Sequence, residues 1–220
     1  KYGYVTHDDY PFGKDDGKLT IPKGSTRREY YLDVNQMTEL YHVFIEKKYP
    51  EDWDQDWREH AHESLGLFLV QYLCNGFNLA DAARLVYDDH YFKSGKKSFR
   101  FIRKKTEDRS DTEIVIPIIE PLQKILDEIA AKPEKGALVF PQIYAGETDE
   151  NKQKARISQE NQNIRKRLGR LVKSMGWEVA PSGTWCRHSF ATNLSHAGGV
   201  PKEYIQEAMG HSVMSGTVTD

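Results

Sequence analysis

Two residues near the end of the sequence combine a permanent positive charge with an imidazole ring. Arg187 opens the run RHSFAT at positions 187–192, and His211 follows Gly210. A guanidinium is always charged, and it can grip a phosphate group through two parallel hydrogen bonds. The pair is therefore a candidate anion site. Each residue also has a structural interpretation, Arg187 as an ordinary residue of a helix start and His211 as a helix C-cap.

Glycine and proline positions place these two residues on a short helical hairpin. We expect a first helix to begin at Arg187 and to end at residues 198–199, which are both glycine. Pro201 then starts a second helix, and Gly210 ends it, in the usual order of proline at a start and glycine past an end. The apolar side of the second helix, which we expect to lie in the core, consists of Tyr204, Ile205 and Met209.

The RHSFAT run, the glycine pair and the later Gly-His-Ser step resemble the active-site segment of the tyrosine recombinases, the phage-integrase family. The resemblance implies that Arg187 is the second catalytic arginine and that His211 binds the same DNA phosphate. It also implies site-specific recombination or integration, by cutting and rejoining DNA strands through a 3′-phosphotyrosyl intermediate, with no metal or other cofactor. Thr184 stands where many members have histidine. A threonine can hydrogen-bond a phosphate, but we expect Thr184 mainly to cap the helix.

The family carries its catalytic lysine on a β-hairpin, where it protonates the departing 5′-oxygen. Lys105 is the matching residue, because the step Lys-Thr follows a strand-like run that ends near residue 102. Lys104 is the alternative if the register of the match is shifted by one residue, and we expect the side chains of Arg103, Lys104 and Lys105 all to contact DNA. Lysines on edge strands are more often simply solvated, and that alternative stays open here.

The sequence departs from the family at the first catalytic arginine. The family motif there is Gly-x-Arg-x-x-Glu or Asp, and this chain reads GFNLAD at positions 76–81, so Asn78 replaces the arginine. Asp81 matches the acidic end of the motif, and the resemblance implies a catalytic role for it. We expect Arg103, or failing that Arg84, to supply the missing charge. Arg84 could equally form a surface ion pair with Asp81.

The nucleophilic tyrosine of the family follows the Gly-His-Ser step after a threonine-rich stretch. Residues 215–220 provide such a stretch, and the sequence then stops at Asp220. We therefore interpret residues 31–220 as a catalytic domain truncated just before its tyrosine. Residues 1–30 are rich in Gly, Asp, Lys and Pro, and we interpret them as a linker or docking arm.

The rest of the pattern predicts a mainly α-helical domain with a small antiparallel β-hairpin or sheet, an α+β fold. Asp33 and Gln36 form a candidate capping box for the first helix. Strand-forming residues dominate 99–102 and 114–118, and Tyr91 and Phe92 could add a third strand. The other predicted segments are helices over 57–74, 79–86, 121–132 and 158–175, and a polar loop over 145–156.

The charge of the whole chain does not by itself indicate a nucleic-acid partner, because 31 Lys and Arg face 33 Asp and Glu. Two local clusters of basic residues do indicate such a partner. The first lies on the predicted β-hairpin and includes Arg103, Lys104 and Lys105, and the second lies on the predicted helix over 158–175 and includes Arg165 and Lys166. We expect a cytoplasmic protein with reduced cysteines and no membrane contact, which binds double-stranded DNA and oligomerises on it. Two alternatives remain, a degenerate DNA-binding relative without catalysis and a helical protein-interaction domain.

Overall fold

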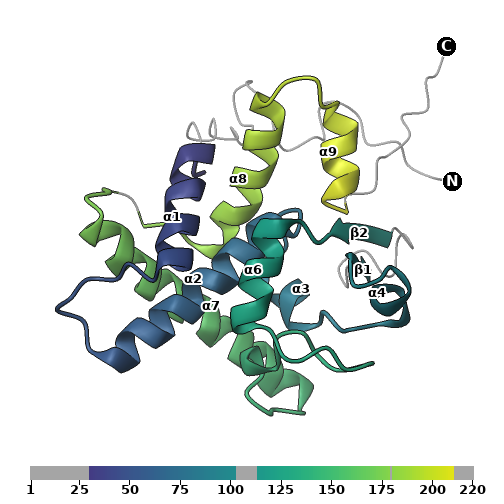
Figure 1. Ribbon diagram of the computed structural model, residues 1–220, viewed down its shortest axis with the longest axis horizontal. Coiled ribbons are helices and arrows are strands. Elements are labelled where there is room, and N and C mark those ends of the chain that lie inside the picture. Colours follow the sequence, from purple (N-terminus) through teal and green to yellow (C-terminus); the bar gives the residue numbers. More distant parts are fainter. Residues whose placement is uncertain (1–29, 103–112, 179, 211–220) are drawn as a thin grey trace, which may run out of the picture.

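Helix α2 (Gln55–Leu73) runs through the middle of the computed structural model, which describes residues 30–102, 113–178 and 180–210. Every residue from Ser64 to Gln71 is buried. A helix that is covered on all sides must be surrounded by other elements. The longer helices around it pack against it, as Figure 1 shows. They are α1 (Val34–Glu46), α6 (Glu120–Ile129), α7 (Glu150–Ser174) and α8 (Gly183–His196).

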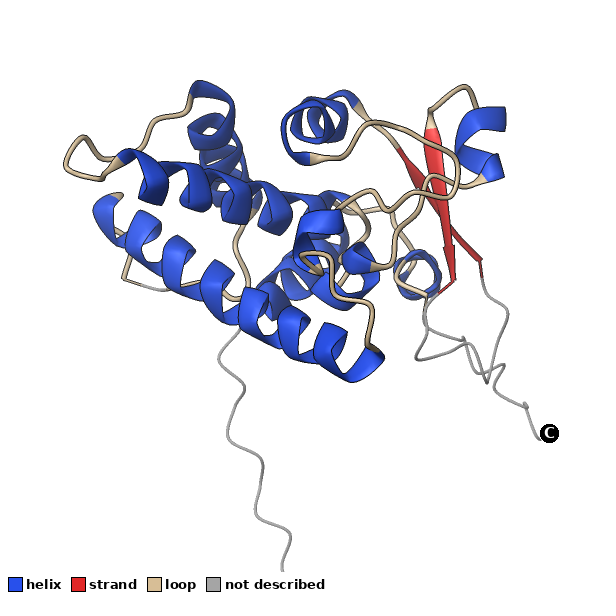
Figure 2. Cartoon of the chain, turned by 90° about the horizontal axis from the view of Figure 1, so that it is seen from below, coloured by secondary structure: helices blue, strands red, loops and turns tan. Residues whose placement is uncertain are grey.

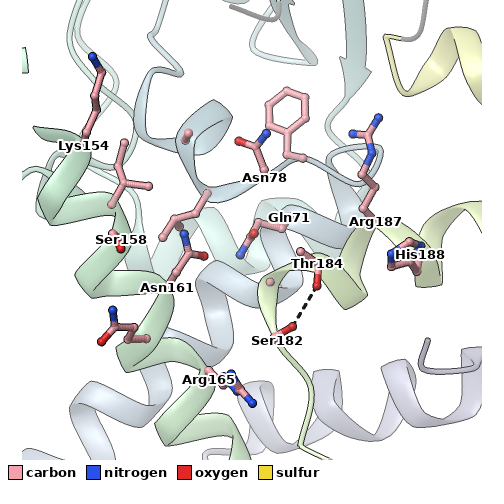
Figure 3. Close-up of a pocket in the computed structure, with 16 residues that line it drawn as sticks. Gln71, Asn78, Lys154, Ser158, Asn161, Arg165, Ser182, Thr184, Arg187 and His188 are labelled. Carbon is pink, nitrogen blue, oxygen red and sulfur yellow. Dashed lines mark hydrogen bonds between the residues drawn. The ribbon is translucent and has the colours of Figure 1, made fainter. Parts of the chain in front are cut away.

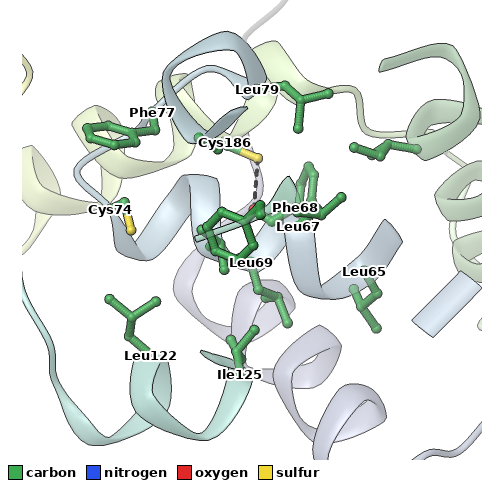
Figure 4. Packing of buried hydrophobic residues seen from close by; sticks show 14 of the residues in the cluster. Leu65, Leu67, Phe68, Leu69, Cys74, Phe77, Leu79, Leu122, Ile125 and Cys186 are labelled. Carbon is green, nitrogen blue, oxygen red and sulfur yellow. Dashed lines mark hydrogen bonds between the residues drawn. The ribbon is translucent and has the colours of Figure 1, made fainter. Parts of the chain in front are cut away.

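The core around α2 is built from large aliphatic and aromatic side chains (Figure 4). Leu65, Phe68 and Leu69 of α2 belong to the same cluster as Leu122 and Ile125 of α6. All five side chains are at most 2% exposed. The burial of this much apolar surface fixes the positions of the helices that surround the candidate site.

Helix α1 begins where the sequence predicts it. The Asp33 carboxylate accepts a hydrogen bond from the Gln36 backbone N–H at 2.8 Å, and the Gln36 side chain accepts one from the Asp33 N–H at 3.0 Å. The predicted capping box is therefore confirmed. Met37, Leu40 and Phe44 face the core.

Two short helices follow α2. Asn78 caps α3 (Leu79–Ala83), which ends earlier than predicted because Val86 turns away to form a β-bridge with Leu138. Tyr91 and Phe92 do not form a strand. They lie in α4 (Asp89–Lys93), whose start is fixed by a 2.9 Å hydrogen bond from the Tyr91 N–H to the Asp88 carboxylate.

Apart from the Val86–Leu138 bridge, the β-structure of the described residues is one antiparallel pair, β1 (Ser98–Ile102) and β2 (Glu113–Pro117). Phe99 lies opposite Ile116, and Phe101 opposite Ile114, and all four side chains are buried. Figure 2 shows the pair at one end of the molecule, beside the helices. The fold is thus mainly helical with a two-stranded antiparallel sheet, as the sequence predicts.

Helix α7 is longer than the sequence indicates. It begins at Glu150, after the short 3-10 helix η2 (Pro141–Ile143), and it is capped by the Asp149 carboxylate, which accepts from the Lys152 N–H at 2.9 Å. The predicted polar loop over residues 145–156 is therefore wrong in its second half, and Ser158 lies inside the helix. The first turns of α7 are almost entirely polar and exposed, so they show no apolar periodicity.

The predicted helical hairpin is present as α8 and α9 (Lys202–Ala208), but with two differences. Helix α8 begins at Gly183, one turn before Arg187. Tyr204 is 61% exposed, so its expected place in the core is wrong, whereas Ile205 and Met209 are buried. Helix α9 lies beside α8 and also packs against β2 (Figure 1). Within the described ranges, no helix combines the length and apolar character needed to cross a membrane.

Candidate functional site

A pocket of about 600 Å³ opens where four helices meet. The end of α2 and the start of α3 form its floor, the N-terminal end of α8 forms one wall, and α7 forms the opposite wall (Figure 3). The polar side chains that line it are Gln71, Asn78, Lys154, Ser158, Asn161, Gln162, Arg165, Ser182, Thr184, Arg187 and His188. Of the residues predicted from the sequence for catalysis or DNA contact, Thr184, Arg165 and Arg187 meet at this pocket.

Arg187 is held in place by main-chain oxygens from two other elements. Its Nη1 donates to the Gly76 carbonyl at 3.2 Å, and its Nη2 donates to the Met209 carbonyl at 3.2 Å. These bonds join the turn after α2 to the end of α9 through a single guanidinium. A guanidinium has five N–H donors, so hydrogen bonds to two carbonyls are compatible with a bound anion.

Gly76 is required for this arrangement. Its φ is +70°, in the left-handed region that side chains avoid, and a Cβ atom there would lie 3.0 Å from the Arg187 Cα. The backbone of the turn therefore approaches α8 as closely as only glycine permits. The glycine of the GFNLAD motif thus allows the close approach of two backbones.

Asn78 and Asp81 have a structural role at the pocket floor. The Asn78 side-chain oxygen accepts from the Asp81 N–H at 2.8 Å, and the Asp81 carboxylate accepts from the Asn78 N–H at 3.3 Å. This reciprocal pair is a capping box for α3. Asn78 lines the Arg187 pocket at the position where the family motif has arginine. A catalytic role for Asp81 stays a prediction.

The N-terminal end of α8 borders the pocket beside Arg187. The N-cap is Ser182, whose Oγ lies 3.0 Å from the Thr184 Oγ1 and makes no side-chain capping bond. The expectation that Thr184 caps the helix is therefore wrong, because Thr184 lies inside the first turn. Backbone N–H groups and the helix dipole make such an end favourable for anions.

The predicted basic cluster on α7 divides between two faces. Arg165 is exposed and lines the pocket. Lys166 points elsewhere, with its Nζ 5.5 Å from the centre of the Trp57 ring, and Arg170 lies 4.9 Å from the same ring. Lys166 is not among the residues that line the pocket. Its predicted DNA contact would have to occur on the α2 side of α7.

Sequence reasoning missed four polar residues of α7 that share the pocket with Arg165, which are Lys154, Ser158, Asn161 and Gln162. The first three form one stripe with Arg165 at helical spacing. The spacing of four, three and four residues was a usable signal. Its first member, Lys154, was hidden because a loop was expected over residues 145–156, whereas the other members lay within the predicted helix over 158–175.

Four of the predicted site residues lie outside the described ranges: Arg103, Lys104, Lys105 and His211. Strand β1 ends at Ile102, directly before Arg103, and Met209 contacts Arg187 two positions before His211. Arg84, the second candidate for the missing charge, lines a different pocket of about 230 Å³. Its guanidinium carbon lies 6.0 Å from the centre of the Phe101 ring. Arg84 is thus not a lining residue of the Arg187 pocket.

Two buried cysteines lie close to these elements in sequence, and neither is suited to nucleophilic chemistry. Cys186 directly precedes Arg187, is completely buried, and donates from Sγ to the Phe68 carbonyl at 3.2 Å (Figure 4). Burial raises the pKa of the Cys186 thiol well above its ordinary value, and it raises the pKa of Cys74 to about 12. Both thiols stay protonated at neutral pH. The described part of the chain contains no cluster of His, Cys, Asp and Glu suited to a metal ion.

Comparison with known proteins assigns this arrangement to a family. The model of the phage integrase family matches residues 31–219, which is nearly the whole chain. The chain belongs to the phage integrase family. Its mainly helical fold is thus that of an integrase-family catalytic domain.

A solved structure supports the fold of this integrase-family chain. The crystal structure of XerA recombinase matches with a TM-score of 0.51 and 15% sequence identity, over 88% of this chain. The match covers 58% of the XerA chain, so the integrase-family chain corresponds to little more than half of that recombinase. Comparison with curated proteins gave no match.

Proposed function

We propose that this chain is the catalytic part of a site-specific DNA recombinase that cuts and rejoins strands through a 3′-phosphotyrosyl intermediate. The observation that carries the proposal is the Arg187 guanidinium, fixed by the Gly76 and Met209 carbonyls at the mouth of a pocket that also contains a helix N-terminus. Both features favour a bound phosphate. Membership of the phage integrase family supports the reaction class.

In the proposed reaction, a tyrosine hydroxyl attacks the phosphorus atom of a DNA phosphodiester. The bond to the 5′-oxygen breaks, and that oxygen takes up a proton, for which Lys105 is the proposed donor. Arg187 and His211 would stabilise the charge on the non-bridging oxygens, because that charge is greatest in the transition state. The reverse attack by a DNA hydroxyl rejoins the strand. We place the tyrosine after Asp220 in the gene product.

The uncharged Asn78 supports one alternative, a relative that binds DNA without cutting it. Asn78 lines the pocket where the family motif has its first arginine, and its side-chain oxygen is used to cap α3. Catalysis would then depend on another cation, for which Arg103 stays the proposed substitute. The two functions differ in one observable, since only the recombinase forms a covalent bond to DNA. Assembly on DNA and a cytoplasmic location belong to the same proposal.

Duplex binding should depend on the cations of the α7 stripe. Changing Lys154 and Arg165 together to alanine removes two exposed charges from the pocket wall. If each contacts one phosphate, the slope of log affinity against log salt should flatten by about two units. Fluorescence anisotropy of a labelled duplex measures this slope between about 50 and 200 mM salt, the range over which duplex affinity typically falls steeply.

A matched control removes two lysines from other faces. Lys124 pairs with Glu120 at 2.8 Å on α6, and Lys135 pairs with Asp89 at 2.7 Å, and neither lines the Arg187 pocket. The double variant Lys124→Ala with Lys135→Ala should keep the wild-type slope. If the salt slope flattens equally in the two double variants, the α7 stripe makes no specific contact with DNA. The support that this stripe gives to the proposal would then be lost.

A further inference from the structure

The side of α8 away from the pocket holds one residue of the distant N-terminal segment by its main chain. Ser189 is completely buried, and its Oγ accepts a hydrogen bond from the Leu32 N–H at 2.8 Å. Asn193 is 8% exposed, and its Nδ2 donates to the Leu32 carbonyl at 3.1 Å. Residues four apart share one face of a helix, so α8 contacts both main-chain polar groups of a single residue, Leu32. We call Ser189 and Asn193, with the Leu32 backbone, the α8 clip.

The clip is extended by side-chain contacts along most of α8. The Tyr30 ring lies 5.4 Å from the Trp185 ring, and the Tyr31 ring stands nearly perpendicular to His196 at 6.1 Å. The Leu32 side chain is fully buried in the core. Residues 30–32 are therefore fixed to α8 from its first turn to its last.

Asn193 also ties the clip to the central helix. The same Nδ2 that donates to Leu32 donates to the Tyr72 hydroxyl of α2 at 3.1 Å. A buried amide that bonds two elements is costly to leave unpaired, because its desolvation would no longer be offset. The three elements α8, α2 and the segment before α1 thus meet at one side chain.

Arg187 lies two residues before Ser189 and so projects from another side of the same helix. On that side, α8 is held by the Gly76 and Met209 carbonyls. On the clip side, it is held by Leu32. Because a helix moves as a rigid rod over this distance, the clip fixes the rotation and the height at which Arg187 meets the pocket.

We propose that Ser189 and Asn193 are positioning residues, which set the place of the Arg187 guanidinium by clamping α8 to the Leu32 backbone. A shift of the segment before α1 would then be transmitted to the anion site. The clip forms hydrogen bonds only with main-chain atoms of Leu32. It therefore constrains the position of residue 32 and not the identity of its side chain. The proposal rests on the proposed function only where a phosphate ligand is used as the readout.

The test uses the chain as it is, with Ser189→Ala as the principal variant. Hydrogen exchange should show the Leu32 amide exchanging about fivefold faster or more, as expected for the loss of one hydrogen bond. The NMR signal of the Arg187 Nε–Hε group should shift in the unliganded protein. Titration with inorganic phosphate, followed at that signal, should give an affinity lower by about 2- to 30-fold, the range of coupling through packed networks. Ser189→Thr, which retains a hydroxyl, should show much smaller changes than Ser189→Ala in all three measurements.

Two controls separate positioning from general loss of stability. Ile125→Val removes a buried methylene on α6, which takes part in none of the clip's hydrogen bonds, and should destabilise the protein to a similar extent. Ser195→Ala changes an exposed hydroxyl on α8 itself. Neither should move the Arg187 signal. If Ser189→Ala moves it no more than Ile125→Val does, the positioning role is wrong.

The outcomes also separate this proposal from the function. If the wild-type chain binds neither phosphate nor duplex DNA, the proposed function fails. The shift of the Arg187 signal in unliganded Ser189→Ala would still show whether the clip positions Arg187. If phosphate binds with wild-type affinity to Ser189→Ala while the Leu32 amide is exposed, the function stands and the clip does not position Arg187.

Discussion

Replacing Arg187 by alanine should slow DNA strand cleavage by about 10²–10³-fold, the usual cost of removing one main donor to transition-state charge. The guanidinium is the pocket cation whose position is fixed by two carbonyls, those of Gly76 and Met209. The measurement is a single-turnover cleavage assay. It uses the gene product with the tyrosine proposed to follow Asp220, and a nicked duplex whose cut end diffuses away so that rejoining cannot occur.

The matched variant is Arg187→Lys. It keeps the positive charge, but a lysine ammonium cannot form two parallel bonds to a phosphate or span both carbonyls. We expect a rate between those of the wild type and the alanine variant. Arg187→Ala should remain folded in circular dichroism at the assay temperature. A cleavage rate for folded Arg187→Ala within about threefold of wild type would contradict the role assigned to this residue.

Replacing Gly76 by alanine should destabilise the protein by about 2–5 kcal/mol. Left-handed backbone costs a non-glycine residue about 1–2 kcal/mol. The added Cβ would meet the Arg187 Cα at 3.0 Å, and overpacking of this kind costs a further 1–3 kcal/mol. Because that contact is with backbone, α8 or the turn must move. Urea denaturation followed by tryptophan fluorescence gives the free energy of unfolding.

Gly95 provides a control with the same backbone conformation. Its φ is also +70°, but no atom lies within 4 Å of the position of an added Cβ. Gly95→Ala should therefore cost only about 1–2 kcal/mol. The difference between the two variants isolates the close approach of the Gly76 turn to α8. Equal losses would mean that this approach is not tight in solution.

Local signals in the sequence were sufficient for several elements. The Asp33 and Gln36 capping box, the two strands and the helical hairpin around residues 198–199 are each specified by residues close together in the chain. Such signals failed where local chemistry was silent or ambiguous. The start of α7 is polar throughout, and Tyr204 follows helical spacing with Ile205 and Met209 but lies outside the core.

The candidate site was predicted only in part. Arg187 and Thr184 were found because their motif is contiguous, although the N-cap is Ser182. Lys154 was missed because it belongs to a helix segment that was taken for a loop, and Asn161 was missed because only the basic and apolar residues of the predicted helix over 158–175 were considered. The clip could not be predicted at all. Ser189 and Leu32 are 157 positions apart, and a contact with a main-chain group leaves no pattern in the partner's side chain.

One measurement tests the central claim most directly. The gene product that extends past Asp220 is incubated with the nicked duplex, denatured, digested and analysed by mass spectrometry. We predict a tyrosine on the C-terminal side of His211 that bears a 3′-phosphonucleotide, and its loss in Arg187→Ala. A wild-type protein that binds the duplex but yields no DNA adduct on any tyrosine would contradict the recombinase account and favour the non-catalytic relative.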